Sequence, residues 1–428
     1  MSNPIVNWWR SRQFRGALQK GNLKKAEKLL QEIERSGARL SGIEKLFRDR
    51  QKLDRRLVRY KQQAIALRQE VVQLQRDRVY LPQNETLIAY IEREFKLHRC
   101  DSSLLQCTGI CDRLFDDFEA NLANLVREEI NKIPTPKRDL ELEAAIVDIE
   151  KLKHGIDPDY NLRLTPHVYL MKYFLENVYC SYLTWFLIYK SRLLPVKFNL
   201  LDIAAGPGTV ACGLALFLYG CTGFIKMPQT HISYYSLEKQ ATLQYRGLQF
   251  WRRYLELQPQ TANTYFQFDT TDIFSYIQQP KKLPQKFFDF ITIFHCFFSD
   301  PESREKSYQA YRKIFAETLR YGGYVLLVVQ GRKLFGFYDR QPQEDIRLEE
   351  NIIGQFVSDL GLQLEWYEYL SSTGKRTPCG GAEFGKFARE CLPLQKFMSS
   401  MNRQYLGLSF NSNYTIDDYA ILAKRSSP

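Results

Sequence analysis

The stretch from Asn199 to Gly213, Asn-Leu-Leu-Asp-Ile-Ala-Ala-Gly-Pro-Gly-Thr-Val-Ala-Cys-Gly, constrains the fold more than any other part of the chain. It predicts a buried strand that ends at Asp202, a tight turn, and an apolar helix that begins at Thr209. Gly206 and Gly208 have no Cβ, so the backbone can turn sharply there and approach a ligand closely. The first N–H groups of the helix point into the turn, where they attract polar or anionic ligand groups.

The glycine spacing favours one class of cofactor over another. A dinucleotide-binding turn has a further glycine three residues after Gly208, and Ala211 occupies that position. The stretch resembles motif I of the class I S-adenosylmethionine-dependent methyltransferases, which usually carry glycine where this chain has Ala204. The resemblance implies that Asp202, Ala204, Gly206 and Gly208 bind S-adenosylmethionine. A strand, turn and helix of this kind that binds no ligand is the alternative.

Later segments follow the order of strands that this family shows. The expected strands are 231–238, 267–274, 287–300, 321–330, 362–370 and 408–424. Together with the strand before Asp202, they predict a Rossmann-like α/β fold with the seven-stranded sheet of a class I methyltransferase. We expect residues 161–428 to form this methyltransferase domain.

Three further residues are predicted to belong to the site. Glu238 ends the second strand, where a carboxylate can accept from both hydroxyl groups of a ribose. By resemblance to the family, Asp272 accepts from the adenine amino group, with Asp269 as the alternative. His295 lies near the end of the fourth expected strand, beside the expected cofactor, and is a candidate general base near neutral pH.

A narrower resemblance concerns segments 205–209, 329–337 and 377–394, which are similar to the methyltransferase-like proteins of the small ribosomal subunit. That family has a cysteine cluster that binds a metal or an iron–sulfur centre in this region. Cys379 and Cys391 correspond to two of its ligands, and two thiolates cannot fill a tetrahedral site. No metal site is therefore expected.

The positive charge is concentrated near the N-terminus. Residues 1–80 contain 20 Lys and Arg and 8 Asp and Glu, which equals the net charge of +12 of the whole chain, and the remainder carries 40 of each sign. We expect residues 1–160 to form a basic α-helical domain, with a helical hairpin over 17–30 and further helices over 84–160. A basic region of this kind suits RNA or a ribosomal particle as the partner of residues 1–80.

A heptad pattern of apolar residues over 43–81 predicts a long, coiled-coil-like helix. Its apolar stripe can pack on a neighbour within the chain, on a protein partner or on a second copy. Its Lys and Arg residues can instead hold the phosphate backbone of RNA, and an anionic membrane surface is a third possibility.

Composition places the chain among globular proteins, with 44% hydrophobic and 25% charged residues. No apolar run has the length of a membrane span, and no secretory signal is visible. Nine irregularly spaced cysteines then indicate reduced thiols and a cytoplasmic location. The expected function is S-adenosylmethionine-dependent methylation of RNA or a ribonucleoprotein. A catalytically inactive scaffold or assembly factor and a small-molecule methyltransferase are the alternatives.

Overall fold

The chain divides into two compact units, Met1–Asp77 and Arg78–Pro428. We expected a domain boundary near residue 160, and the second unit instead begins at Arg78, because residues 81–149 share a hydrophobic core with the sheet. The computed structural model describes residues 4–20, 22–37, 40–45, 47–48, 78–258, 262–276 and 283–425.

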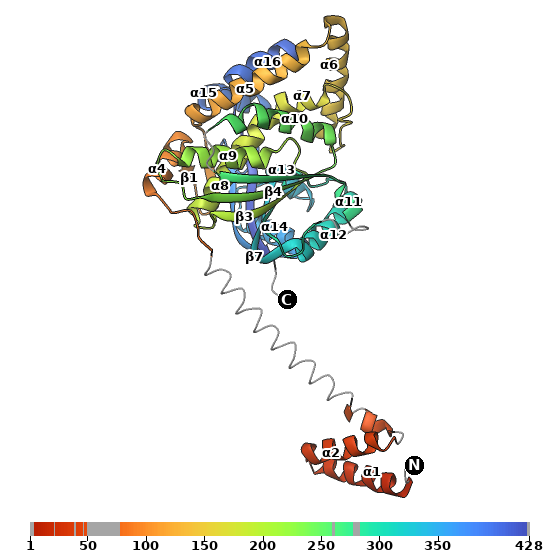
Figure 1. The fold of residues 1–428 in the computed structure, drawn as a ribbon. Coiled ribbons are helices and arrows are strands. Elements are labelled where there is room, and N and C mark those ends of the chain that lie inside the picture. Colours follow the sequence, from red (N-terminus) through yellow and green to blue (C-terminus); the bar gives the residue numbers. More distant parts are fainter. Residues whose placement is uncertain are drawn as a thin grey trace. The chain divides into compact units, whose positions relative to one another are not determined.

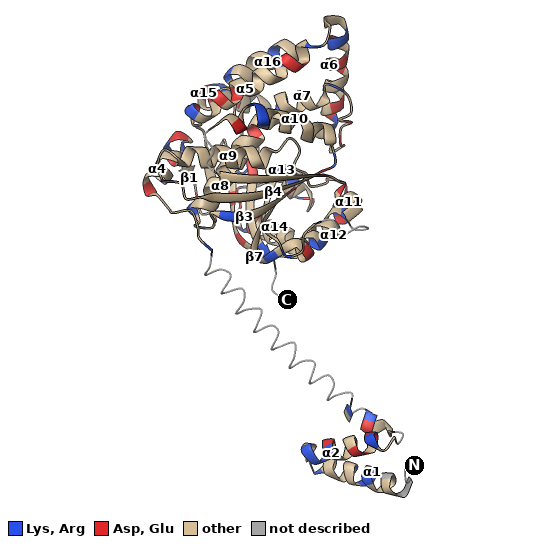
Figure 2. Cartoon of the chain, in the orientation of Figure 1, with Lys and Arg blue, Asp and Glu red and all other residues tan. Residues whose placement is uncertain are grey.

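The first unit is built on two helices, α1 (Pro4–Gln19) and α2 (Leu23–Arg35). The side chain of Asn22 accepts from the N–H of Lys25 and so caps α2. A small core closes the pair, formed by Phe14, Ala17, Ala26, Leu29 and Leu30. Two helices therefore lie where a helical hairpin was expected over 17–30. Lys and Arg residues occur in both helices (Figure 2).

Most of the helix expected over 43–81 lies outside the described residues, since 49–77 are not among them. Its last residues are not helical. Tyr80 pairs with Pro195 in an antiparallel bridge, and Leu81 is buried in the core. The guanidinium of Arg78 donates to Asp289 and to the Gly322 carbonyl. The prediction that the helix continues to residue 81 is wrong, because the sheet unit takes up these residues in an extended conformation.

The second unit is built on one mixed sheet of nine strands in the order β1-β2-β8-β9-β7-β6-β3-β4-β5 (Figure 1). The strands are β1 (Leu97–Arg99), β2 (Leu104–Cys107), β3 (Lys197–Ile203), β4 (Thr230–Glu238), β5 (Ala262–Thr270), β6 (Phe288–Phe294), β7 (Leu319–Gln330), β8 (Leu362–Ser371) and β9 (Asp417–Arg425). Strands β3 to β7 are parallel to one another where they pair, and β9 runs antiparallel to both of its neighbours.

All seven expected strands are present, and the expected count of seven is nevertheless too low. The additional strands β1 and β2 lie within residues 84–160, for which only helices were expected. Strand β2 pairs in parallel with β8, from Leu104 opposite Tyr369 to Gln106 opposite Ser371. Strands of three and four residues are too short to show a periodic pattern, so they could not be predicted from the sequence.

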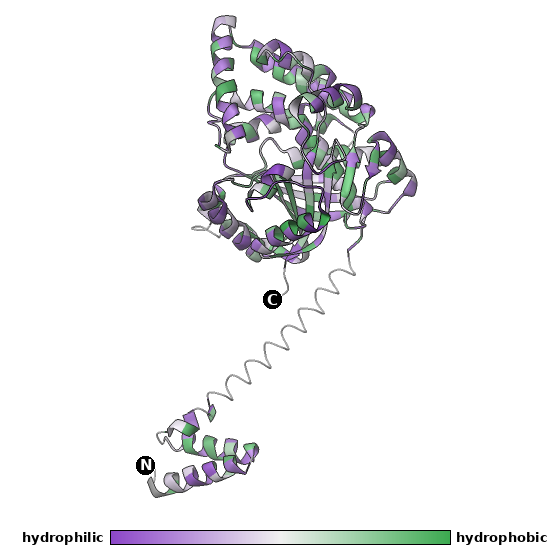
Figure 3. Ribbon diagram, turned by 180° about the vertical axis from the view of Figure 1, so that it is seen from behind, coloured by the Kyte–Doolittle hydropathy of each residue, from purple (hydrophilic) through white to green (hydrophobic). Residues whose placement is uncertain are grey.

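Helices cover both faces of this sheet (Figure 1), and Figure 3 shows hydrophobic strands between them. The helices of this unit are α4 (Glu85–Glu94), α5 (Asp112–Asn131), α6 (Thr135–Glu150), α7 (Thr165–Tyr169), α8 (Leu175–Lys190), α9 (Thr209–Cys221), α10 (Ala241–Arg253), α11 (Ile273–Tyr276), α12 (Pro301–Thr318), α13 (Gly331–Gly336), α14 (Ile346–Asp359), α15 (Gly381–Cys391) and α16 (Lys396–Leu406). Successive strand residues alternate between two cores: Leu200 belongs to the core with α5, α8 and α9, and Leu201 belongs to the core with α12 and α14.

Two features of the helices bear on the site. Helix α7 continues into α8 through one π-helical turn, η2 (Leu170–Phe174), and such turns are frequent at functional sites. Helices α8 and α9 approach closely at Gly213, where a Cβ would lie 2.3 Å from the Ser181 hydroxyl.

Within the described residues, no helix is both long and apolar enough to cross a membrane.

The close approach at Gly213 predicts a loss of stability on substitution. In Gly213→Ala the new methyl group meets the Ser181 side chain and the Tyr182 backbone of α8, so the two helices must separate. We expect the free energy of unfolding to fall by about 1–3 kcal/mol in urea denaturation. Gly354→Ala is the control, because Gly354 lies within α14 with open space around it and should gain up to about 1 kcal/mol from helix propensity. Equal effects of the two changes would contradict this account of the packing.

Candidate ligand site at the carboxyl ends of β3 and β6

The sheet reverses its winding between β3 and β6. Strands β4 and β5 continue from β3 in one direction, and β6 and β7 continue in the other. The connections that leave β3 and β6 therefore diverge, and in open α/β sheets ligands bind outside the carboxyl ends of the strands at such a switch point. Asp202 lies near the end of β3, and His295 directly follows β6. The topology brings these two predicted site residues to the same edge of the sheet.

The turn after β3 adopts a left-handed backbone at three positions. Ala204 and Gly206 each have φ of 55°, and Gly208 has φ of 81°. The Ala204 N–H donates to the carbonyl of Leu237 at the end of β4, over 2.7 Å. Ala204 holds this backbone in spite of its Cβ, at a cost of about 1–2 kcal/mol relative to glycine. The turn predicted from Gly206 and Gly208 is present.

Helix α9 begins at this turn without a side chain to cap it. Gly208 is the N-cap residue and has no side-chain acceptor to offer. The first N–H groups of a helix have no partner within the helix. In α9 these groups face the turn and are suited to a polar or anionic ligand group.

Glu238 holds the turn through its carboxylate. One carboxylate oxygen accepts from the N–H of Gly206, and the other accepts from the N–H of Gln240, both over 2.7 Å. Burial raises the pKa of Glu238 in spite of these two donors. Each oxygen keeps a second lone pair, so the carboxylate can accept from a ligand while it holds the turn.

Helix α10 supports the turn from the other side. A Cβ on Gly247 would lie 2.0 Å from the carbonyl oxygen of Pro207. Only glycine permits the helix to approach the turn this closely. The turn is thus fixed by β4 and by α10.

Asp202 is buried behind the turn and bonded by two hydroxyl groups. Tyr234 donates to one carboxyl oxygen over 2.5 Å, and Thr292 donates to the other over 2.8 Å. Burial raises the pKa of Asp202 to about 7, and the two hydroxyl donors oppose this shift. The sequence signal was the acid itself, whereas its partners on β4 and β6 could not be predicted.

His295 has a left-handed backbone, with φ of 57°, and its N–H donates to the carbonyl of Val328. Its Nδ1 lies 3.6 Å from a carboxyl oxygen of Asp418, and its buried Nε2 has no hydrogen-bond partner among the described residues. Burial, with a smaller contribution from Lys333, lowers the pKa of His295 to about 4. Burial also raises the pKa of Asp418 to about 7. The imidazole is therefore neutral at pH 7.

A small hollow lies over the turn. Asp202, Ala204, Gly206 and His295 line it, and these four were predicted as site residues. The other lining residues are Tyr169, Asn177, Ala205, Pro207, Thr209, Val210 and Phe294. The hollow has a volume of about 30 Å³, which is room for one water molecule.

The continuous helix formed by α7, η2 and α8 covers the hollow, and we call it the covering helix. Its residues Tyr169 and Asn177, on either side of the π-helical turn, close the hollow. The Asn177 side-chain amide donates to the Tyr169 hydroxyl over 3.3 Å. Neither residue was predicted as a site residue from the sequence.

Three predicted residues lie outside the hollow. Gly208 and Glu238 act on the turn itself, as described. Asp272 accepts from the N–H of Phe274 at the start of α11, and its carboxylate is 3.9 Å from the Lys239 ammonium. Asp269, the alternative to Asp272, accepts from the Thr271 hydroxyl. Across the residues that the structure describes, no group of three His, Cys, Asp or Glu is arranged to hold a metal ion.

The raised pKa of Asp202 predicts a pH-dependent stability. The folded protein keeps this carboxyl protonated up to about pH 7, whereas the unfolded chain ionises it near 3.8. The stability that the protonated Asp202 carboxyl contributes is therefore fully present below pH 3.8, the pKa in the unfolded chain, and is lost as pH rises through 7, the pKa in the folded protein. We expect Asp202→Asn to reduce the loss of unfolding free energy between pH 6 and pH 8 by about 1 kcal/mol. Chemical denaturation at both pH values measures this difference.

Asp139→Asn is the matched control, since the Asp139 side chain is 63% exposed and should leave the pH dependence unchanged. An unaltered pH dependence in Asp202→Asn would mean that the carboxyl is ionised in the folded protein.

Comparison with known proteins gives structural neighbours only. No protein-family model matches the chain, and no curated protein matches its sequence. Three solved structures illustrate the likeness. An S-adenosylmethionine-dependent methyltransferase from Methanosarcina mazei is 14% identical, with 56% of this chain and 96% of that chain covered and a TM-score of 0.32. The YcgJ protein of Bacillus subtilis is 17% identical, with 57% and 99% covered and a TM-score of 0.30.

The third structure is the glycopeptide N-methyltransferase MtfA in complex with sinefungin. It is 12% identical, with 58% of this chain and 87% of that chain covered and a TM-score of 0.31. All three TM-scores lie below 0.5, and the function proposed below therefore rests on the topology and turn geometry of this chain.

Proposed function

We propose that residues 78–428 bind S-adenosylmethionine and that the protein is a methyltransferase. One observation carries the proposal: a left-handed turn at the switch point of the sheet leads into the uncapped helix α9, between the carboxyl groups of Asp202 and Glu238. Close backbone approach, free helix N–H groups and acids at successive strand ends suit a nucleoside joined to an amino acid. S-adenosylmethionine supplies a methyl group activated by its sulfonium.

The residues of the chain have separate tasks in this proposal. The free lone pairs of Glu238 accept from the ribose hydroxyls, and the half-exposed carboxylate of Asp272 accepts from the adenine amino group. His295 stands at the end of β6 as a neutral imidazole. Its Nε2 has no partner among the described residues and is suited to accept a hydrogen bond or a proton from the acceptor. Asp418 lies beside the other ring nitrogen.

Binding of this donor requires the covering helix to move. The hollow of about 30 Å³ is far smaller than the ~300–1,000 Å³ of ordinary small-molecule sites. Tyr169 is half-buried and immediately precedes the π-helical turn of η2, where the regular helical hydrogen bonds are interrupted. Displacement of this side chain opens the hollow over Gly206.

The same small volume favours a second candidate, a scaffold with a methyltransferase fold that binds no donor. The two candidates differ in one measurable property. If the protein is a scaffold, it should have no affinity for S-adenosylmethionine even when the Tyr169 side chain, which covers the hollow, is removed. If it is a methyltransferase, its affinity for S-adenosylmethionine should rise when the hollow is enlarged.

Calorimetric titration with S-adenosylmethionine and S-adenosylhomocysteine separates these candidates. We expect saturable binding to the full chain, loss of binding in Gly206→Val, and binding at least as tight in Tyr169→Ala as in the unchanged protein. The valine is disfavoured at φ of 55° and fills the turn, whereas the alanine removes the cover. Thermal unfolding of each variant shows whether it is folded. No binding by folded Tyr169→Ala would favour the scaffold.

We propose RNA or a ribonucleoprotein as the acceptor, on the basis of charge alone. The unit Met1–Asp77 carries 19 Lys and Arg against 8 Asp and Glu. In the described part of 78–428, acidic and basic residues are interspersed (Figure 2). A cationic unit gains affinity for nucleic acid by releasing counterions.

Exposed lysines of α2 test this part of the proposal. Lys24, Lys25 and Lys28 are exposed, so reversing their charges to Glu should leave the helical pair folded. We expect weaker binding of single-stranded RNA and a salt dependence of log K that is shallower by about 0.7 for each phosphate that the protein no longer neutralises.

The matched control reverses the same number of exposed lysines on the other unit, at Lys132, Lys137 and Lys153. It should bind single-stranded RNA as the unchanged protein does, with the same salt dependence. Equal weakening in the two triple variants would place RNA binding outside Met1–Asp77.

A further inference from the structure

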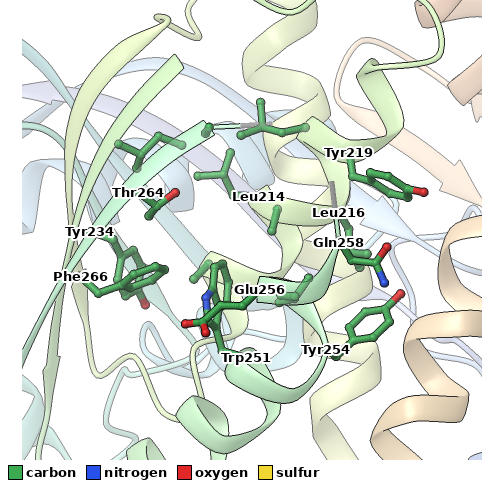
Figure 4. Close-up of a pocket in the computed structure, with 16 residues that line it drawn as sticks. Leu214, Leu216, Tyr219, Tyr234, Trp251, Tyr254, Glu256, Gln258, Thr264 and Phe266 are labelled. Atoms are coloured by element: carbon green, nitrogen blue, oxygen red, sulfur yellow. The ribbon is translucent and has the colours of Figure 1, made fainter. Parts of the chain in front are cut away.

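A larger cavity lies between α9, α10 and strands β4 and β5, on a face of the sheet rather than at its carboxyl ends (Figure 4). Its volume is about 310 Å³, at the lower limit of small-molecule sites. The lining residues are Ala211, Leu214, Ala215, Leu216, Leu218, Tyr219, Ile232, Tyr234, Trp251, Tyr254, Leu255, Glu256, Gln258, Ala262, Thr264 and Phe266. The cavity and the hollow over the turn share no lining residue.

Aromatic rings form much of this wall. The Phe266 ring meets Trp251 edge-on at 4.7 Å between centroids and meets Tyr234 at 5.4 Å. Figure 4 shows these three side chains facing one space. The hydroxyls of Tyr234 and Tyr254 are already bonded, to Asp202 and to Asp117. The rings therefore offer the cavity their faces and edges, while these two hydroxyl groups are engaged elsewhere.

The charge around the cavity has one sign. Glu256 is the single charged residue among the described residues that line it, and no Lys, Arg or His is among them. Glu256 is exposed, and in the part of the chain that the structure describes its carboxylate makes no ion pair. Aromatic faces attract cations and repel anions, and an unpaired carboxylate adds to this preference.

We propose that this cavity binds a small organic cation with an apolar body, such as a substituted ammonium compound. Leu214, Leu218 and Ile232 receive the apolar part. The Trp251 ring and the Glu256 carboxylate receive the charged part. The proposal does not depend on methyl transfer, because the cavity is separate from the hollow over the turn.

Tyr234 contacts both the cavity and the carboxyl group of Asp202 at the hollow. Its ring lines the cavity, and its hydroxyl donates to Asp202 beneath the turn. A ligand that shifts this ring changes the hydrogen bonding of a carboxyl that lines the hollow.

Three probes of one shape test the charge preference. Benzyltrimethylammonium, neopentylbenzene and phenylmethanesulfonate share a benzyl body and carry positive, zero and negative charge. We expect calorimetric titration of the full chain to show saturable binding of the cation, at least tenfold weaker binding of the anion, and intermediate binding of the hydrocarbon. Preference for the anion, or no saturable binding of the cation, overturns the proposal.

Two variants locate the binding. Ala215→Trp fills the cavity from α9 and should abolish binding of the cation. Glu256→Gln keeps the shape of an exposed side chain. It should weaken binding of the cation about fivefold without changing the affinity for the hydrocarbon. Thermal unfolding establishes that both variants fold. Unchanged affinity for the cation in folded Glu256→Gln, or in folded Ala215→Trp, contradicts the proposal.

Discussion

The connection between the ends of β3 and β4 is the constraint on which the site depends. The Gly206 N–H reaches the Glu238 carboxylate, and the Ala204 N–H reaches the Leu237 carbonyl. These bonds hold the backbone in the left-handed region at three of five successive residues. Helix α10 touches the same turn at Gly247, so the turn cannot relax toward an ordinary conformation without displacing a helix. The free start of α9 is a consequence of this arrangement.

The long elements could be predicted from the sequence, because their patterns extend over many residues. The seven strands from β3 to β9 and the helix that begins at Thr209 follow from apolar runs and glycine. The prediction failed at β1 and β2, which are stabilised by pairing with each other and with β8 and have no pattern of their own. It also failed at Arg78, whose buried ion pair with Asp289 depends on a contact between distant segments.

In the site, too, local features could be predicted from the sequence and contacts between distant segments could not. Residues within the turn were predictable, because Gly206 and Gly208 are required by the backbone itself. Partners from other elements were not: Tyr169 and Asn177 come from the covering helix, and Asp418 comes from the last strand. Their types alone do not distinguish them from core residues. Glu238 was identified, while its bond to the turn was not, since a strand-end acid has the same appearance in both roles.

The hydroxyl of Tyr234 links ligand binding to the uptake and release of protons. It bonds a carboxyl whose pKa lies at about 7, so small changes in that bond change the fraction of Asp202 that is ionised near neutrality. A molecule that displaces the Tyr234 hydroxyl from Asp202 therefore causes the protein to take up or release part of a proton, although the molecule carries no exchangeable proton itself. Its binding heat then depends on the ionisation enthalpy of the buffer.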